Sequence, residues 1–407
     1  MKYWRGYLTA LILAACTWGL IEFAQSHWTL VDMVYPYTTR MVQDFMAVWS
    51  NGVAYCVWQL FLLVLVAGVM ASVVMMIVWK WNPIQWFGWV MAVVSLVSLL
   101  NTGMYGLNEY AGTLSDDIRL NVTDYSIDEL QTSAEFYLQE ANRLSQQVKR
   151  DANGHVEAAD LETLALQAAD GFDTLTYDKY YSIFAGDRTP VKELSWSNMF
   201  SRKGKTYVHV AITGEAAVNP DTPAVGMPFA ICQAMANRVC IANQQDAAFA
   251  AFLACTHNTS AEFQYAGYFM AYRYCYNALA SKSISSAQTA INALAQQECA
   301  QLKQDLSDYN DSFAPGSDNA YYEEPVQRIN FSKFFSKLKR NPLKKNKTII
   351  TTVEKADAPE RSDVVDLLVS WHIQEYVLPL LKEEEVTFDP LDETQVDLTG
   401  LIRERND

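Results

Sequence analysis

Residues 53–79 read VAYCVWQLFLLVLVAGVMASVVMMIVW, a run of 27 residues without a charged side chain. A helix that crosses the hydrocarbon core of a bilayer needs about 20 mainly apolar residues, so this run predicts a transmembrane helix. Two more apolar stretches, residues 7–23 and 84–100, lie on either side of it. The sequence therefore predicts a membrane domain over residues 1–107. Its three helices are expected over residues 4–24, 53–79 and 84–106.

The first stretch has a second interpretation. Lys2 and Arg5 precede the apolar run, as basic residues do in a cleaved signal peptide. No clear small-x-small cleavage site follows the run, so a membrane helix is favoured.

The basic residues around these helices predict their direction. Lysine and arginine are enriched on the cytoplasmic side of a membrane, so Lys2, Arg5 and Lys80 place the N-terminus and the second turn there. Arg40, in the predicted outer loop, weakens this bias. Three crossings put the chain after Leu107 outside. We therefore expect a multi-pass protein of the cell membrane with an extracytoplasmic domain.

The charges are unevenly distributed. The first 110 residues hold four basic and four acidic side chains, whereas the other 297 hold 27 basic and 42 acidic ones, which accounts for the net charge of −15. Nucleic-acid binding needs a positive surface, so nucleic acid is excluded as a partner. The partner expected from the apolar helices is the lipid bilayer.

Seven cysteines are present, and five of them lie in the soluble part without a CxxC pair. An odd number in helix-like surroundings favours buried free thiols over a disulfide framework, although one bridge stays open. A cysteine zinc site is not expected.

The chain after the membrane domain is expected to be mainly helical. Ser126-Ile-Asp-Glu129 is a capping box that opens a helix to about Arg150, and a second helix is expected over residues 156–169. Residues 206–212 alternate and are β-branched, which predicts a strand. A helical block follows over residues 225–306. Breaks in it are expected near Asn243, Asn258 and Ser281. The fold class is therefore mainly α, with a small sheet in an α-rich α+β soluble domain.

The C-terminal third is expected to be less regular. Residues 307–362 indicate a polar linker with a basic, phenylalanine-containing segment, which fits either a membrane surface or a solvated helix and turn. Residues 363–407 predict a helix over Val364–Lys382 and an acidic tail.

Several segments resemble a family of bacterial membrane proteins, the domain-of-unknown-function 3810 family. They are Gly106–Asn108, Thr213–Asn219, Pro228–Phe229, Phe249–Cys255 and Tyr265–Tyr274. The similarity runs from the first membrane helix to about residue 305. It implies a few N-terminal membrane helices followed by a zincin-like metallopeptidase domain, here residues 108–306.

The zinc-binding motif of that family, His-Glu-x-x-His on a helix, is replaced in this chain. Its positions fall on Gln233, Ala234, Met235, Ala236 and Asn237, and those of a later Glu-Asp-Glu stretch fall on Gln244, Gln245 and Asp246. Residues four apart share one helical face, so two histidines there can hold one zinc ion. Neutral amides are weak zinc ligands, and alanine supplies no general base. We therefore expect no metal, no other cofactor and no catalytic residue.

The resemblance thus implies a degenerate zincin, an inactive pseudopeptidase that binds a peptide or protein along the predicted strand. Its candidate binding residues are Glu215, Gln233, Asn237 and Asp246, the last of which is expected to be a solvated or capping acid. One alternative is a structural membrane protein whose cleft is filled. Another is a hydrolase of non-zinc mechanism, with Cys232 or Cys240 as the nucleophile.

Overall fold

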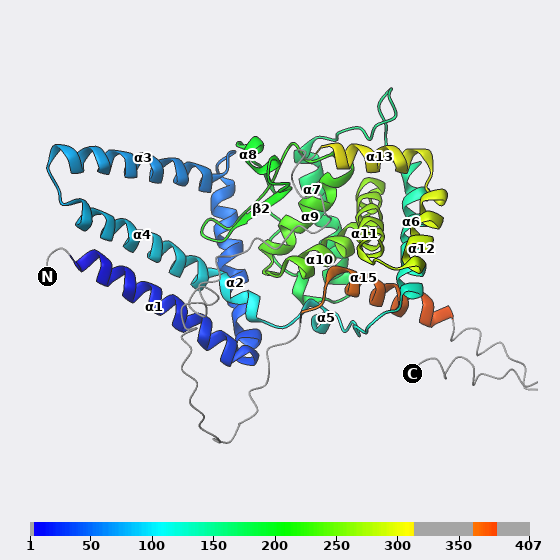
Figure 1. The fold of residues 1–407 in the computed structure, drawn as a ribbon, viewed down its shortest axis with the longest axis horizontal. Coiled ribbons are helices and arrows are strands. Elements are labelled where there is room, and N and C mark those ends of the chain that lie inside the picture. Colours follow the sequence, from blue (N-terminus) through cyan, green and yellow to red (C-terminus); the bar gives the residue numbers. More distant parts are fainter. Residues whose placement is uncertain (1–3, 313–360, 381–407) are drawn as a thin grey trace, which may run out of the picture.

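The computed structural model describes residues 4–312 and 361–380. Figure 1 shows two parts: long helices extend to one side, and a larger, mainly helical body lies on the other. Three of the long helices are apolar enough to cross a membrane: α1 (Arg5–Ser26), α3 (Val57–Val78) and α4 (Pro83–Met104). The predicted fold class, mainly α with three membrane-spanning candidates and a small sheet, is confirmed at this level.

Helices α1 and α4 pack closely against each other. A Cβ atom added at Gly6 would lie 2.5 Å from the carbonyl carbon of Gly88, so glycine at this crossing lets the two backbones approach. Asn82 begins α4 as its N-cap, because its side chain accepts hydrogen bonds from the backbone N–H groups of Ile84 and Gln85. Pro83 follows at a position that needs no N–H donor.

A fourth long helix, α2 (Trp28–Asn51), occupies the segment expected to be an outer loop. Arg40 lies on this helix, buried against the body, and so the prediction that it lies in a loop was wrong. Pro36 stands inside α2. A proline in a helix interior normally argues against helix formation, which is why the sequence did not reveal α2.

The first half of the body consists of short elements and two longer helices. The capping box at Ser126 and Glu129 is present and opens α6, which ends at Ser145 rather than near Arg150. The second predicted helix, α7, covers Leu161–Asp173. The elements of this half are η2 (Gly106–Tyr110), α5 (Leu114–Asp117), α6 (Ile127–Ser145), α7, the π-helical turn η3 (Thr174–Asp178), η4 (Ser182–Phe184) and α8 (Ser197–Ser201).

The sheet has the strand order β1-β3-β2, with β1 (Lys192–Glu193) parallel and β2 (Tyr207–Val210) antiparallel to β3 (Glu215–Val218). The predicted strand at residues 206–212 is confirmed as β2, which lies at an edge of the sheet. Gly214 makes the turn into β3 with a φ of 64°, a conformation that favours glycine.

Five helices follow in the predicted block. They are α9 (Met227–Arg238), α10 (Gln244–Thr256), α11 (Ala261–Ser281), α12 (Ser285–Gln297) and α13 (Ala300–Asp311), with the short turn η5 (Ala224–Gly226) before them. The three expected breaks separate the first four of these helices, and a further break at residues 298–299, between α12 and α13, was not predicted. Helix α13 continues past residue 307, where a linker was predicted to begin. The basic segment and the acidic tail lie outside the described residues.

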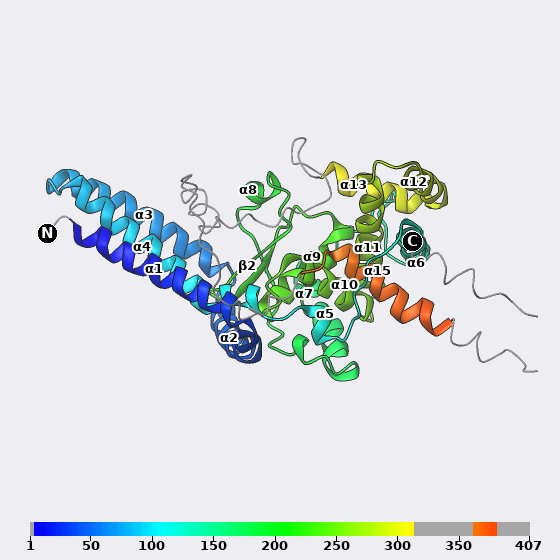
Figure 2. The ribbon, with the colours of Figure 1, turned by 60° about the horizontal axis from the view of Figure 1, so that its bottom comes forward.

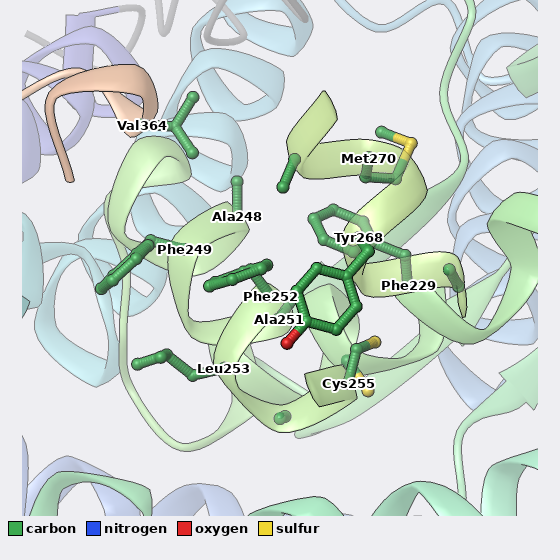
Figure 3. Close-up of a cluster of buried hydrophobic side chains, with 14 of the residues drawn as sticks. Phe229, Ala248, Phe249, Ala251, Phe252, Leu253, Cys255, Tyr268, Met270 and Val364 are labelled. Carbon is green, nitrogen blue, oxygen red and sulfur yellow. The ribbon is translucent and has the colours of Figure 1, made fainter. Parts of the chain in front are cut away.

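The core of the body is built by α6, α7, α9, α10 and α11 together with a helix far along the chain, α15 (Val364–His372). Figure 3 shows Phe252 of α10 between Phe249 of the same helix and Tyr268 of α11, with Val364 of α15 near the start of α10. A π-helical turn, η6 (Ile373–Val377), continues α15. Helices α7 and α10 nearly touch, because a Cβ atom at Gly171 would lie 2.0 Å from the carbonyl oxygen of Ala254.

Candidate functional site

Helix α9 carries the motif positions through the centre of the body. Every residue from Pro228 to Arg238 is buried, so this helix has no solvent-facing side. Gln233 and Asn237 lie one turn apart, and the Asn237 side-chain amide donates to the carbonyl oxygen of Gln233 at 3.2 Å. Both side chains are therefore held within the protein as neutral polar groups.

A hydrogen-bond network connects these positions with the start of α10. The Asn237 amide lies 3.5 Å from the Tyr207 hydroxyl, which donates to the side-chain oxygen of Gln244 at 2.7 Å. Tyr207 belongs to the edge strand β2. The structure thus brings Asn237 and Gln244 together, although the two residues come from different helices and were aligned with different parts of the motif.

The C-terminal segment covers this place. A cavity of about 30 Å³ remains beside Gln233, Gln244 and Gln245, and residues 363–365 form part of its wall. The backbone N–H of Val364 donates to the side-chain oxygen of Gln245 at 3.1 Å. A cavity of that size holds about one water molecule. The space beside Gln233 is therefore small, and the C-terminal segment forms part of its wall.

Asp246 is buried beside the same segment. Its carboxylate accepts a hydrogen bond from Arg361 at 2.6 Å, and Arg361 also donates to the carbonyl oxygens of Glu109, Ala111 and Gly112. Burial raises the pKa of Asp246, and the Arg361 charge opposes that rise. The expectation of a solvated or capping acid was wrong, because α10 is capped by Asn243 and Asp246 faces the protein interior.

Glu215 lies at a different place. Its carboxylate accepts hydrogen bonds from the backbone N–H groups of Val57 at 2.7 Å and Trp58 at 2.9 Å, and it pairs with Lys192 at 2.7 Å. A negative charge at a helix N-terminus satisfies unpaired N–H groups and the helix dipole. Glu215 thus fastens α3 to the sheet, and it does not line the cavity beside Gln233.

All seven cysteines are free, which confirms the prediction of unbridged thiols. Cys232 is buried in the core, and Cys240 accepts a hydrogen bond from the Thr39 hydroxyl at 3.5 Å. Burial raises the pKa of Cys240 to about 11. A thiol with so high a pKa is protonated at neutral pH, and the thiolate is the nucleophilic form.

A larger cavity, of about 310 Å³, lies elsewhere in the body and was not foreseen. Its polar lining includes Lys179, His257 and Glu375, and its aromatic lining includes Tyr268 and Trp371. The His257 Nδ1 atom lies 2.9 Å from the Leu253 carbonyl oxygen, so in the neutral ring Nδ1 carries the proton. Burial lowers the pKa of His257. These residues come from four separate segments, and no local pattern in the sequence marks them.

Potential metal ligands are dispersed through the described part of the chain. Over residues 4–312 and 361–380, no group of three or more His, Cys, Asp or Glu side chains is placed to hold a metal ion.

A family model described as "Protein of unknown function (DUF3810)" matches residues 31–345. The chain belongs to this family. The region matched to the DUF3810 family begins within α2 and includes α3, α4 and the body as far as α13. Helix α15, which fills the core, lies beyond it. No curated protein and no solved structure matches the chain.

Proposed function

We propose that the protein is a membrane-anchored, catalytically inactive pseudopeptidase with a zincin-like body, whose former active-site cleft holds the chain's own C-terminal segment. One observation carries the proposal. Gln233 and Gln244, which replace metal-site residues of the family, line one small cavity together with residues 363–365, and Tyr207 connects Gln244 to Asn237.

The chemistry of these side chains supports the absence of catalysis. Peptide hydrolysis by a zincin needs imidazole and carboxylate ligands that hold the metal and a general base for its bound water. Amide side chains at positions 233 and 237 offer neither charge nor basicity, and Ala234 has no functional group. The nearby carboxylate, Asp246, is engaged by Arg361. The lack of a general base alone lowers the rate of such a reaction by a factor of about 10²–10⁴.

The contacts of the C-terminal segment favour a filled cleft over an open peptide-binding one. Residues 361–363 precede α15 without helix or strand structure, and the backbone N–H of Val364 donates to the side chain of Gln245. An external peptide would have to displace this segment. The first candidate function is therefore that of a structural membrane protein that contacts its neighbours through its outer surface. The second candidate is a protein that binds a peptide or protein partner in the cleft.

The apolar helices and the basic residues support the proposed location. Helices α1, α3 and α4 cross the cell membrane as a multi-pass anchor, and Lys2, Arg5 and Lys80 lie on the cytoplasmic side. The body is then extracytoplasmic. Labelling of a Tyr180→Cys variant in intact cells with a membrane-impermeant maleimide tests this direction, because Tyr180 lies on the body and is 84% exposed. Labelling only after cell lysis would place the body in the cytoplasm.

Zinc content and peptide cleavage test the loss of catalysis. The full chain, purified in detergent and saturated with zinc, is expected to retain far less than one zinc per chain after dialysis and to leave a peptide library uncut. Stoichiometric zinc together with chelator-sensitive cleavage would overturn the proposal. The matched variant carries Gln233→His, Ala234→Glu and Asn237→His, and recovered zinc binding by it would show that the zincin geometry persists beneath the changed side chains.

Captured partners separate the two candidate functions. The full chain is cross-linked in its membrane and its partners are compared with those of a Gln233→Ala and Asn237→Ala variant. A structural component keeps the same partners, whereas a peptide binder loses those that enter the cleft.

A further inference from the structure

Helix α2 lies across the ends of the membrane helices. It follows α1 after His27, and α3 begins six residues after its last residue, Asn51. The Tyr35 hydroxyl donates to the carbonyl oxygens of Thr102 and Gly103 at the end of α4. In Figure 1, α2 runs across the ends of α1, α3 and α4 that face the body, and in Figure 2 it is seen almost along its axis. All three membrane helices therefore meet the body at α2.

One face of α2 is apolar and exposed. The side chains of Met33 and Met41 are each 74% exposed. Large apolar residues continue along this face at the spacing of successive helical turns. They include Leu30, Phe45, Val48 and Trp49. At 1.5 Å per residue the helix is about 36 Å long, so this face is much larger than the scattered apolar residues of an ordinary soluble surface.

The charged residues of α2 face the other way. Arg40 donates to the carbonyl oxygens of Val239 and Ser182. Asp32 accepts from the backbone N–H of Gly112 at 2.6 Å, and Asp44 accepts from that of Asp187 at 3.1 Å. A helix on a water-soluble protein points its charges outward and its apolar stripe inward. The charges of α2 are turned into the body, and its apolar side chains point outward.

We infer that α2 lies in the plane of the membrane surface, with its exposed apolar face in the lipid, so that the body is seated directly on the bilayer. The occupant of this face is lipid because the helices at both ends of α2 enter the membrane there. Interfacial helices bury such a face about 5–10 Å deep, at the boundary of headgroups and acyl chains. Trp49 and Tyr55 are exposed near the end of α2, as aromatic residues are at this depth.

This placement sets the distance between the sheet and the membrane. Gly214, in the turn between β2 and β3, lies against α2, since a Cβ atom there would be 2.7 Å from the backbone nitrogen of Ala47. The inference rests on the proposed membrane crossing of α1, α3 and α4. With α2 in the interface, the strand β2 is held close above the lipid, and a partner of this edge has to approach along the membrane surface.

Spin labels on the full chain test the inference. Cys16 and Cys299, the two cysteines that are not buried, are replaced by serine, and single cysteines are introduced at Met33, Met41 and Val48. The protein is reconstituted into nanodiscs of phosphatidylcholine and phosphatidylglycerol. Collision rates of the label with oxygen, which concentrates in lipid, and with a water-soluble nickel chelate are then measured. At the three α2 positions oxygen collisions are expected to exceed those with nickel.

Two matched controls calibrate the collision rates expected in water and in lipid. Leu166→Cys, on a body helix at 56% exposure, is expected to report water, and Val64→Cys, on α3 at 70% exposure, is expected to report lipid. Nickel accessibility at Met41 equal to that at position 166 would overturn the inference. So would low accessibility to both reagents, which would mean that protein, such as a second copy of the chain, covers the face. A water signal at Val64 would instead contradict the membrane crossing itself.

A charge on the apolar face gives an independent measurement. Phe45→Glu is expected to lower the Tm of the protein in nanodiscs, because the interface must take up a carboxylate, whereas Leu166→Glu leaves it nearly unchanged. Equal Tm values for the two variants would also overturn the inference.

Discussion

Arg361 holds the C-terminal segment on the body, and its removal gives the sharpest test of the filled cleft. The Asp246 side chain is only 4% exposed and that of Arg361 21%. Arg361→Met removes the charge and the donors while keeping an apolar stem. Removal of one partner from a buried ion pair costs about 3–5 kcal/mol, because the other charge stays buried. We expect Arg361→Met to lower the free energy of unfolding by at least about 3 kcal/mol at pH 8.

The pH dependence of this loss follows from Asp246. Burial already raises the pKa of this carboxyl, and without Arg361 the pKa rises further. When the folded-state pKa of an acid exceeds the unfolded value, the penalty is fully present above the folded pKa and disappears below the unfolded one. The difference between Arg361→Met and the unmodified protein is therefore expected to shrink as the pH falls towards 4.

Urea unfolding of the full chain in detergent, followed by tryptophan fluorescence and circular dichroism, measures these free energies. Asp246→Asn and the double variant complete a double-mutant cycle. The double variant is expected to lose about 2 kcal/mol less than the sum of the single losses. Arg143→Met is the control, because its ion pair with Glu140 is exposed and contributes at most about 0.5 kcal/mol. A loss below about 1 kcal/mol for Arg361→Met, or an additive cycle, would refute the proposed role of Arg361.

Three other substitutions have expected outcomes. Gly171→Ala would place a methyl group against the carbonyl oxygen of Ala254 and separate α7 from α10. We expect it to lower the free energy of unfolding by about 2 kcal/mol or more in the same urea assay. An unchanged urea midpoint would contradict that packing. Glu215→Gln is expected to lower the free energy of unfolding by about 3 kcal/mol, because Lys192 and the N-terminus of α3 lose a buried partner charge. The control, Glu193→Gln at an exposed position, is expected to be near neutral. Equal losses for the two variants would exclude the capping role of Glu215. Burial lowers the pKa of His372 to about 4, below the unfolded value of about 6.5. The free energy of unfolding is therefore expected to fall by at most about 3 kcal/mol as the pH falls from about 6.5 to 4. His372→Gln is expected to remove this pH dependence, which circular dichroism melts at several pH values would show.

Elements with a strong local signal could be predicted from the sequence. The three membrane candidates follow from long uncharged runs, and the break near Asn243 is an N-cap, since the Asn243 side chain accepts from the backbone N–H groups of Gln245 and Asp246. Strand β1 has only two residues and β3 is buried on both faces, so neither has an alternating pattern. Helix α2 was missed because Pro36 stands in its interior, where a proline normally argues against a helix.

The candidate site was predictable only in part. The resemblance assigned Asn237 to the His-Glu-x-x-His positions and Gln244 to the later acidic stretch of the same metal site, and the structure connects the two through Tyr207. The C-terminal segment beside this site is held by Arg361, which is 115 residues away from its partner Asp246 in the chain. No local pattern predicts a contact over such a separation, because it depends on how the whole body packs. Glu215 was assigned to the same place from its position before α9, yet its side chain points towards α3.

The position of α15 in the chain has a consequence for biosynthesis. Leu367, Leu368 and Val369 are fully buried among α6, α10 and α11, but they are translated after every other core element described. Until α15 has been translated, the buried side chains of α6, α10 and α11 that pack against it lack this partner. The described core can therefore be completed only after the chain has been translated through His372.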